Sequence, residues 1–233
     1  MLCYLYLQVF NVDQENMQEG LREVEIVSVE EIADKVYILE FERFFEFEAG
    51  QIIKLAWPGE AKPRLYSIAS GEKQPNIQIL FNVVGEGQLT PMMAGMRHGD
   101  KILASMPLGK FTGTGGPAWW IAQGTGIAPF ASMLRSGQTH NKTLIHGGRY
   151  HNSFYYQDEF IPMLGERYIR CSSKDSGDSL YHGRVTDYLK SIDHLPVGPL
   201  YYLCGSAEMV VETRDILIEK GVGFGEIVSE IYF

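Results

Sequence analysis

An apolar stretch at residues 64–70, RLYSIAS, contains side chains that suit a ligand better than a protein core. Its apolar members predict a buried strand, and they are Leu65, Ile68 and Ala69. Its polar members are a fixed cation, a phenol and a hydroxyl, namely Arg64, Tyr66 and Ser67. Burying such groups without partners costs about 1–3 kcal/mol for each neutral group, and more for the guanidinium. The stretch therefore indicates a bound ligand.

Two further motifs follow apolar runs in the second half of the chain. In QGTGIAP, Gly124 and Gly126 would let the backbone approach a pyrophosphate, and a helix beginning near Ala128 would offer unpaired N–H groups to an anion. In LCGSAEM, Cys204 and Gly205 can place a small polarizable side chain beside a planar ring. Both motifs also have simpler explanations, because tight turns need glycine and a free cysteine is usually a small buried hydrophobe.

Candidate phosphate ligands lie in both halves. Arg149, Lys174 and Arg184 come from neighbouring connections and together would suit a monophosphate dianion, although each alone is typical of a solvated surface charge. Gly85, Gly87 and Thr90 precede an expected helix, where they could form an anion site within reach of Arg64. Thr90 could equally be a simple N-cap, and both roles can hold together.

Two kinds of framework must position these groups. From about residue 20 to 113, short strands alternate with Gly or Pro turns, which predicts an antiparallel barrel. The expected strands are LREVEIVSVEEI, KVYILEFER, QIIKLAW, RLYSIAS and IQILFNVV. One helix, QLTPMMAGMRHGD, is expected to start with a Thr90 cap, to hold Pro91 in its first turn and to end in a Gly-Asp turn.

The second half predicts a parallel α/β sheet covered on both faces, because strands alternate with helices. The expected strands are AWWIAQ, TLIHGGR, RYIRCSS, LYYLCG and EIVSEIYF. The helices between them are expected within GTGIAPFASMLRSG, QDEFIPML, GRVTDYLKSI and SAEMVVETRDILIEKG. We place an N-terminal extension at 1–19, the barrel at 20–115 and a Rossmann-like nucleotide-binding domain at 116–233. Ligands of such a sheet bind beyond the carboxyl ends of its strands.

Composition excludes several functional classes. The 233 residues are 45% apolar and 21% charged, as in ordinary globular proteins. The net charge of −9 argues against a nucleic-acid partner, yet residues 50–113 carry seven basic groups against four acidic ones and could receive an anion. The apolar opening, MLCYLYLQVF, is too short for a membrane span and lacks the basic flank of a signal peptide. It is expected to be an extra strand, a loose tail or a misassigned start before Met17.

The cysteines suggest a reducing compartment. Cys3, Cys171 and Cys204 are odd in number and widely spaced, which fits neither a disulfide framework nor a zinc or iron–sulfur ligand set. We therefore expect a cytoplasmic protein that binds no metal.

The order of these motifs resembles the ferredoxin–NADP reductase family, most closely its bacterial ferredoxin or flavodoxin reductases. The resemblance covers the chain from about residue 21. It is carried by RLYS, GxxLT before a helix, GTGIAP, LCG and the terminal SEIYF. The segments HGRVT (182–186) and PLGKFT (107–112) also look like family motifs.

The resemblance implies that FAD lies between barrel and sheet. Arg64 would pair with the pyrophosphate, Tyr66 would lie against the isoalloxazine or ribityl chain, and Ser67 would bond near flavin N5. The full FAD set implied is Arg64, Leu65, Tyr66, Ser67, Gly87, Gln88, Leu89, Thr90, Thr125, Tyr232 and Phe233.

The resemblance also implies NADPH on the parallel sheet, with nicotinamide C4 against flavin N5. The residues implied are Gly124, Thr125, Gly126, Arg149, Lys174, Arg184, Cys204 and Gly205. Lys174 stands where the bacterial family has an arginine, which keeps the charge but weakens a bidentate contact. The neighbouring Asp175 could instead favour NADH, since an acidic residue binds the ribose of that nucleotide.

The implied catalytic set is Ser67, Cys204, Glu230 and Tyr232. Glu230-Ile231-Tyr232 matches the Glu-x-Tyr ending of plant-type members, whose terminal ring covers the flavin. This chain departs from that ending by adding Phe233. We expect Tyr232 to be the stacking ring, and an ordinary last strand with aromatic packing is the alternative.

The expected function is hydride transfer between NADPH and FAD, with single electrons passing to or from a separate ferredoxin or flavodoxin. A basic face for that partner would comprise Lys54, Lys62, Lys73, Arg97 and Lys101. The chain itself is expected to be a monomer. Two alternatives remain: an NADH-dependent reductase component of an oxygenase or other redox partner, and an FAD-binding subunit that transfers no hydride.

Overall fold

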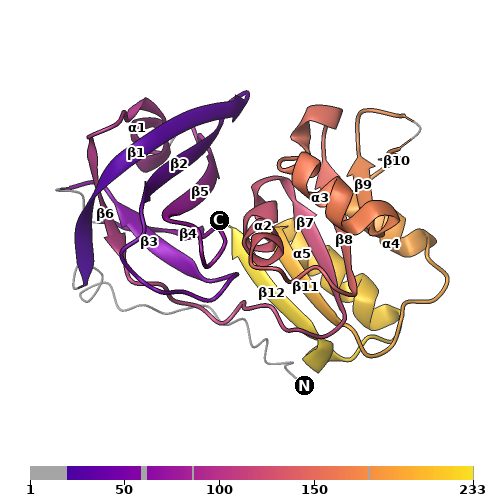
Figure 1. The fold of residues 1–233 in the computed structure, drawn as a ribbon. Helices are drawn as coiled ribbons and strands as arrows, with labels where there is room; N and C mark the ends of the chain where they lie inside the picture. Colours follow the sequence, from indigo (N-terminus) through magenta and orange to yellow (C-terminus); the bar gives the residue numbers. More distant parts are fainter. Residues whose placement is uncertain (1–19, 59–61, 86, 178, 233) are drawn as a thin grey trace, which may run out of the picture.

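The computed structural model describes residues 20–58, 62–85, 87–177 and 179–232, and of Tyr232 only the backbone. The expectations for residues 1–19, for Phe233 and for the Tyr232 ring lie outside this part of the chain. Figure 1 shows a barrel of strands followed by a sheet with helices on both faces. This arrangement confirms the predicted fold class.

The first half is an antiparallel barrel with strand order β4-β3-β6-β1-β2-β5. Its strands are β1 (Leu21–Ala33), β2 (Val36–Glu42), β3 (Ile52–Ala56), β4 (Arg64–Ser67), β5 (Asn76–Asn82) and β6 (Lys101–Ser105). The two edge strands meet where Ile68 forms an isolated bridge with Ile79 and the Ala69 N–H donates to the Gln78 carbonyl at 2.8 Å. This contact closes the barrel. Strand β6 was not predicted, because KILAS is short and follows directly on the helical segment.

Alternating apolar side chains fill the barrel. Ile26, Leu39, Phe41 and Ile53 are each 0% exposed and belong to one cluster. The RLYSIAS stretch is only partly buried: Ile68 and Ala69 are inside as predicted, but Leu65 is 47% exposed. The expectation that Leu65 is buried is wrong, because β4 pairs only with β3 over Arg64–Ser67 and its outer side faces solvent there.

The helix of the barrel, α1 (Leu89–Gly95), differs from the prediction at both ends. Gln88 is its N-cap residue, so the expected Thr90 cap is wrong. The Thr90 hydroxyl instead accepts a hydrogen bond from the Val84 N–H at 3.0 Å, which ties the preceding loop to the helix. Pro91 does lie in the first turn, but the helix ends at Gly95 instead of in the later Gly-Asp turn.

The second half is a six-stranded sheet, with order β10-β9-β8-β7-β11-β12, in which every pair is parallel. Its strands are β7 (Ala118–Gln123), β8 (Lys142–Gly148), β9 (Tyr168–Ser172), β10 (Tyr181–His182), β11 (Leu200–Ser206) and β12 (Ile227–Tyr232). All were predicted except β10, which has two residues and therefore no periodicity to detect. The helices are α2 (Ala128–Arg135), α3 (Gln157–Leu164), α4 (Val185–Ser191) and α5 (Ala207–Glu219).

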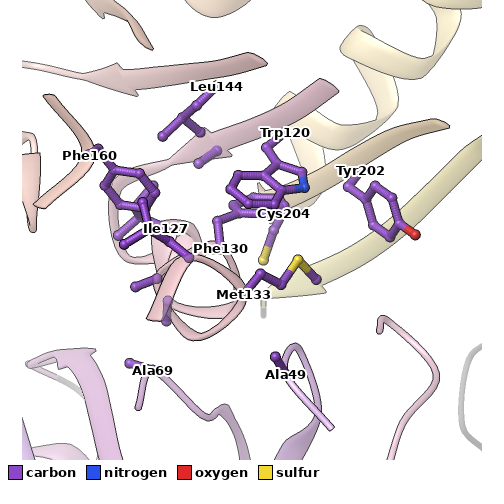
Figure 2. Packing of buried hydrophobic residues seen from close by; sticks show 14 of the residues in the cluster. Ala49, Ala69, Trp120, Ile127, Phe130, Met133, Leu144, Phe160, Tyr202 and Cys204 are labelled. Atoms are coloured by element: carbon purple, nitrogen blue, oxygen red, sulfur yellow. The ribbon is translucent and has the colours of Figure 1, made fainter. Parts of the chain in front are cut away.

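The helices cover both faces of this sheet (Figure 1). Helices α4 and α5 bury one face through Val185, Leu189 and Ile216. Helix α2 lies between the other face and the barrel, and its residues from Ala128 to Leu134 are all buried. Figure 2 shows Phe130 and Met133 of α2 between Trp120 of the sheet and the barrel residues Ala49 and Ala69. A helix that is buried all round is the joint between the two halves.

Among the described residues, no helix combines the length and apolar character that crossing a membrane requires.

Candidate active site

A hydrogen bond joins the barrel to the last strand of the sheet. Ser67 ends β4 and is only 3% exposed, while Glu230 lies on β12. The Ser67 hydroxyl donates to Glu230 Oε1 at 2.5 Å, although the two residues are 163 positions apart. The fold therefore brings together two members of the predicted catalytic set.

Burial changes the chemistry of Glu230. Desolvation raises the pKa of its carboxyl from 4.5 to about 7, and the hydrogen bond from Ser67 opposes that rise. A carboxyl with a pKa near neutrality can hold or release a proton at physiological pH. Glu230 is thus chemically suited to a role in proton exchange at this junction.

Cys204 is a neighbour of this pair on the adjacent strand. It lies on β11 in register with Glu230 on β12 and with Ala122 on β7, and it is fully buried. A Cβ atom at Gly126 would come within 2.3 Å of the Cys204 carbonyl oxygen. Only glycine fits there, so the GTGI turn packs directly against the Cys204 backbone. The steric explanation for this glycine therefore holds, whatever the turn binds.

The GTGI turn is a short 3₁₀ helix, Gly124–Ile127. It is contacted by a histidine for which the sequence predicted no role. His146 of β8 is fully buried, with Nε2 3.3 Å from the Gly124 carbonyl and Nδ1 3.1 Å from the Tyr168 hydroxyl. Burial lowers the pKa of His146 to about 4, so the ring is neutral. Nε2–H then donates to Gly124, and Nδ1 accepts from Tyr168. The position of this histidine inside the apolar run TLIHGG could have indicated the contact, because a buried imidazole needs hydrogen-bond partners.

Two of the three predicted phosphate ligands lie side by side. Arg149 and Lys174 follow β8 and β9, and the Lys174 N–H donates to the Arg149 carbonyl at 3.0 Å. Both side chains are exposed, and neither forms an ion pair within the described part of the chain. Arg184, the N-cap residue of α4, is exposed and lies 3.7 Å from Glu208 of α5. Asp175 is engaged elsewhere, since its Oδ2 accepts from the His151 backbone N–H at 2.7 Å.

The predicted flavin residues on the barrel form a less enclosed group. Arg64 is exposed, and Tyr66 is partly buried, which raises its hydroxyl pKa to about 12. A Cβ at Gly87 would lie 3.6 Å from the Thr90 hydroxyl, so the loop before α1 does bring Gly87 and Thr90 together. The expectation that Arg64 lies close enough to Thr90 to share an anion site stays a prediction.

One member of the predicted basic face forms an ion pair within the barrel. Lys101 is paired with Glu23 of β1 at 2.6 Å, so its charge is partly neutralised. Lys62, Lys73 and Arg97 are exposed and Lys54 is partly buried.

Comparison with known proteins places this geometry in a family. Residues 120–215 match the model of the oxidoreductase NAD-binding domain. The chain is 34% identical over 223 residues to ferredoxin–NADP reductase B of Sorangium cellulosum, covering 83% of this chain and 90% of that protein. It is 28% identical over 196 residues to the flavodoxin/ferredoxin–NADP reductase of Escherichia coli, covering 72% of this chain and 77% of that protein.

A solved structure shares the fold over nearly the whole chain. A ferredoxin NADP+ reductase from Neisseria gonorrhoeae with bound FAD and NADP superposes with a TM-score of 0.83 at 23% identity, covering 92% of this chain and 99% of that one. This likeness is one of fold, whereas the 34% identity to the Sorangium protein over most of both chains establishes that the chain belongs to the ferredoxin–NADP reductase family.

Proposed function

We propose that this chain is an FAD-dependent ferredoxin/flavodoxin–NADP reductase. The observation that carries the proposal is the 2.5 Å hydrogen bond between Ser67 of the barrel and Glu230 of the last strand, with Cys204 on the adjacent strand. This junction gathers three polar or polarizable side chains from both halves at one place. A reaction between ligands held by the two halves would take place there.

The residues of the barrel fit a flavin dinucleotide. Arg64 offers a guanidinium that has no ion pair among the described residues, which suits the paired charges of a pyrophosphate. Tyr66 offers an aromatic face with a hydroxyl that stays protonated. Gly87, Gln88, Leu89 and Thr90 supply the neighbouring loop, and Thr125 would contribute from the other half. Leu65 is exposed on the same strand and is available to cover part of the ligand.

The residues of the parallel sheet fit NADP(H). Gly124, Thr125 and Gly126 form the turn after β7, and Gly205 lies at the carboxyl end of β11, where pyrophosphates bind in such sheets. Arg149 and Lys174 present two exposed cations from adjacent strand ends, and a 2′-phosphate would satisfy both. Arg184 is the third cation, shared with Glu208. Because the Asp175 carboxylate is already bonded to His151, it is poorly placed to select NADH.

FAD, when bound, supplies the exchange between a hydride of the nicotinamide and single electrons for a protein partner. The chain's own residues orient the two rings and control protons. Ser67 holds its hydroxyl proton toward Glu230 Oε1, and Glu230 can take up or release a proton near neutral pH. The Cys204 backbone lies against Gly126, and any side chain at position 126 would push the turn away from β11. The backbone of Tyr232 continues β12 beyond Glu230, and we assign the stacking aromatic to Tyr232, with Phe233 after it.

The partner is a ferredoxin- or flavodoxin-type electron carrier. We propose that it docks on exposed cations of the barrel, with Lys62, Lys73 and Arg97 contributing more than Lys101, which Glu23 neutralises. A monomer suffices for the reaction, since Ser67, Cys204 and Glu230 all come from one chain. Cys171 is a buried free thiol, which suits a reducing compartment such as the cytoplasm.

The proposal is tested by cofactor identification and turnover. Purified protein is expected to be yellow, to release FAD on denaturation, and to reduce a ferredoxin or flavodoxin with NADPH at a higher kcat/KM than with NADH. Protein that binds no flavin during refolding, or that turns over NADH and NADPH equally, would contradict it.

A further inference from the structure

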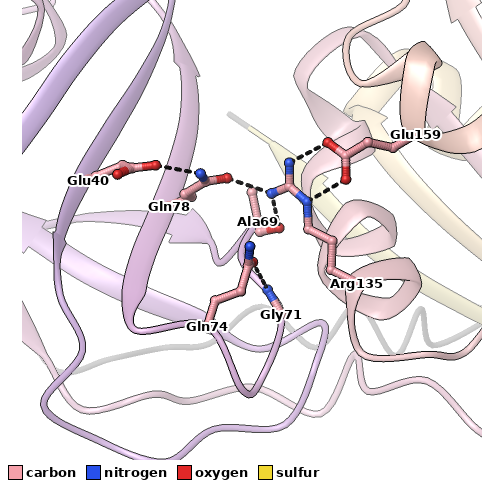
Figure 3. A network of polar contacts seen from close by, with 7 residues as sticks. All are labelled: Glu40, Ala69, Gly71, Gln74, Gln78, Arg135 and Glu159. Carbon is pink, nitrogen blue, oxygen red and sulfur yellow. Dashed lines mark hydrogen bonds and ion pairs between the residues drawn. The ribbon is translucent and has the colours of Figure 1, made fainter.

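The carboxyl end of α2 is bonded to both halves of the molecule through one side chain. Figure 3 shows the guanidinium of Arg135 between Glu159 of α3 and the barrel. On the α3 side, Nε and Nη2 donate to the two carboxylate oxygens of Glu159 at 2.8 and 2.6 Å. On the barrel side, Nη1 donates to the Ala69 carbonyl at 2.8 Å and to Gln78 Oε1 at 2.5 Å. Gln78 in turn donates to Glu40 of β2.

Neighbouring residues of α2 repeat this connection. The Ser132 hydroxyl donates to the Ser70 carbonyl at 2.7 Å, and the Glu72 N–H donates to the Ser136 hydroxyl at 3.0 Å. A Cβ at Gly71 would lie 2.9 Å from the Arg135 Cβ atom, so the two backbones are in close contact. Residues 69–72 of the barrel are thus fixed to the last turn of α2 at several points.

Helix α2 connects the GTGI turn at its first residue with the barrel at its last turn. Its first residue follows directly on the GTGI turn, and its last turn is bonded to the segment that follows Ser67 by two residues. The helix therefore spans from the expected nicotinamide side to the expected flavin side. We propose that Arg135 is a positioning residue that sets the placement of the barrel segment carrying Ser67 relative to the GTGI turn.

The geometry distinguishes Arg135 from a surface ion pair. Its side chain is 12% exposed, whereas Glu159 is 39% exposed. A largely buried guanidinium with a bidentate carboxylate and two further acceptors has little freedom, because moving it leaves several groups unpaired. The ring of Tyr156 lies 4.5 Å beneath the guanidinium and restricts it further. Since a misplacement of about 1 Å between reacting groups can lower a rate about a hundredfold, a rigid joint here would matter for hydride transfer.

This inference rests on the proposed function, and its test uses the FAD-loaded protein. Arg135→Lys keeps the charge but loses the bidentate fork. Gln78→Met removes one of the two barrel acceptors of Nη1 and leaves the Arg135–Glu159 pair intact. The rate of flavin reduction by saturating NADPH is measured by anaerobic stopped flow. The affinity for 2′,5′-ADP, which probes the cations of the nucleotide half alone, is measured by calorimetry. Arg214→Lys, in a pair with Asp215 on α5, is the matched control.

We expect the flavin reduction rate to fall by about tenfold or more in Arg135→Lys and by several-fold in Gln78→Met. FAD content and 2′,5′-ADP affinity are expected to stay within about twofold of wild type, and the control is expected to behave as wild type. Reduction at the wild-type rate in both variants would overturn the inference. A parallel loss of rate, FAD content and 2′,5′-ADP affinity would also overturn it, because the role would then be structural. A wild-type flavin that NADPH leaves oxidised would instead refute the proposed function, and the inference with it.

Discussion

Two arginines of the nucleotide-binding half, Arg135 and Arg149, have opposite surroundings. Arg135 is only 12% exposed at the joint with the barrel, and its nitrogens donate hydrogen bonds to Glu159, Ala69 and Gln78. Arg149 is exposed at the carboxyl edge of the sheet, beside Lys174, and has no ion pair in the described part of the chain. The first guanidinium is satisfied by protein, while the second is available to a ligand.

The contrast teaches how to separate positioning residues from binding residues. A largely buried cation whose three nitrogens all donate to protein acceptors stabilises one arrangement of the fold, and removing it leaves its partners unpaired. An exposed cation contributes little to stability and much to the binding of an anion. Loss of Arg135 should therefore affect stability and geometry, whereas loss of Arg149 should affect nucleotide affinity.

The largest effect is expected from the double substitution Arg149→Ala, Lys174→Ala. It removes the two cations that we propose bind the 2′-phosphate, so the KM for NADPH should rise about a hundredfold or more while the KM for NADH stays unchanged. The free energy of unfolding should change by less than about 0.5 kcal/mol. Steady-state kinetics with both nucleotides measures this, with Lys190→Ala, an exposed cation paired with Glu212, as the control. An unchanged preference for NADPH would show that other residues bind the phosphate.

Arg135→Ala should have the reverse profile. The substitution removes the ion-pair partner of Glu159 and the hydrogen-bond donor to the Ala69 and Gln78 oxygens of the barrel. The free energy of unfolding should therefore fall by about 2–4 kcal/mol. Urea unfolding of the purified protein measures this beside Arg149→Ala. A loss below about 1 kcal/mol would mean that the joint depends on the apolar packing of α2 and not on its ion pair.

Much of this framework could be predicted from the sequence, because its signals are local. Alternation of apolar residues identified β1 and β2, and alternating strands and helices identified the parallel sheet. Local patterns could not separate Arg135 from Arg149, since their surroundings are made by residues far along the chain, such as Ala69. The Ser67–Glu230 bond spans 163 positions and was not predicted, although the family resemblance implied that both residues are catalytic.

Local chemistry also misled at single residues. Thr90 has the type and place of an N-cap, but its hydroxyl is used by Val84. Leu65 has the type of a core residue, but it faces out from an edge of the barrel. In both cases the role of the side chain depends on its surroundings in the folded chain, and the neighbouring residues in the sequence do not reveal these surroundings.

The buried junction has a pH dependence with a defined sign. Because the folded-state pKa of Glu230 is about 7 and its ordinary value is 4.5, the folded protein binds a proton more tightly than the unfolded chain. This contribution to stability is complete below the ordinary value and is lost as the pH rises through 7, with an upper limit of about 3 kcal/mol. Glu230→Gln should flatten the decline of unfolding free energy between pH 5 and 8. If the free energy of unfolding had the same pH dependence in the variant and the wild type, Glu230 would not be the group that binds this proton.

The smallest effect on stability is expected at the Tyr168–His146 hydrogen bond, next to the GTGI turn. Tyr168→Phe removes the donor to His146 Nδ1, leaving a buried acceptor unpaired, and should lower the free energy of unfolding by about 1–2 kcal/mol. Chemical denaturation measures the loss, and Tyr188→Phe, a partly buried tyrosine against Tyr181, is a matched control. Equal stability of the two variants would mean that the His146 contacts do not hold the turn.

The most direct test of the central claim is an anaerobic titration of the yellow wild-type protein with NADPH, followed at the absorbance maximum of the oxidised flavin. The account predicts stoichiometric bleaching with NADPH and a much weaker response to NADH at equal concentration. A flavin absorbance that NADPH leaves unchanged would contradict it.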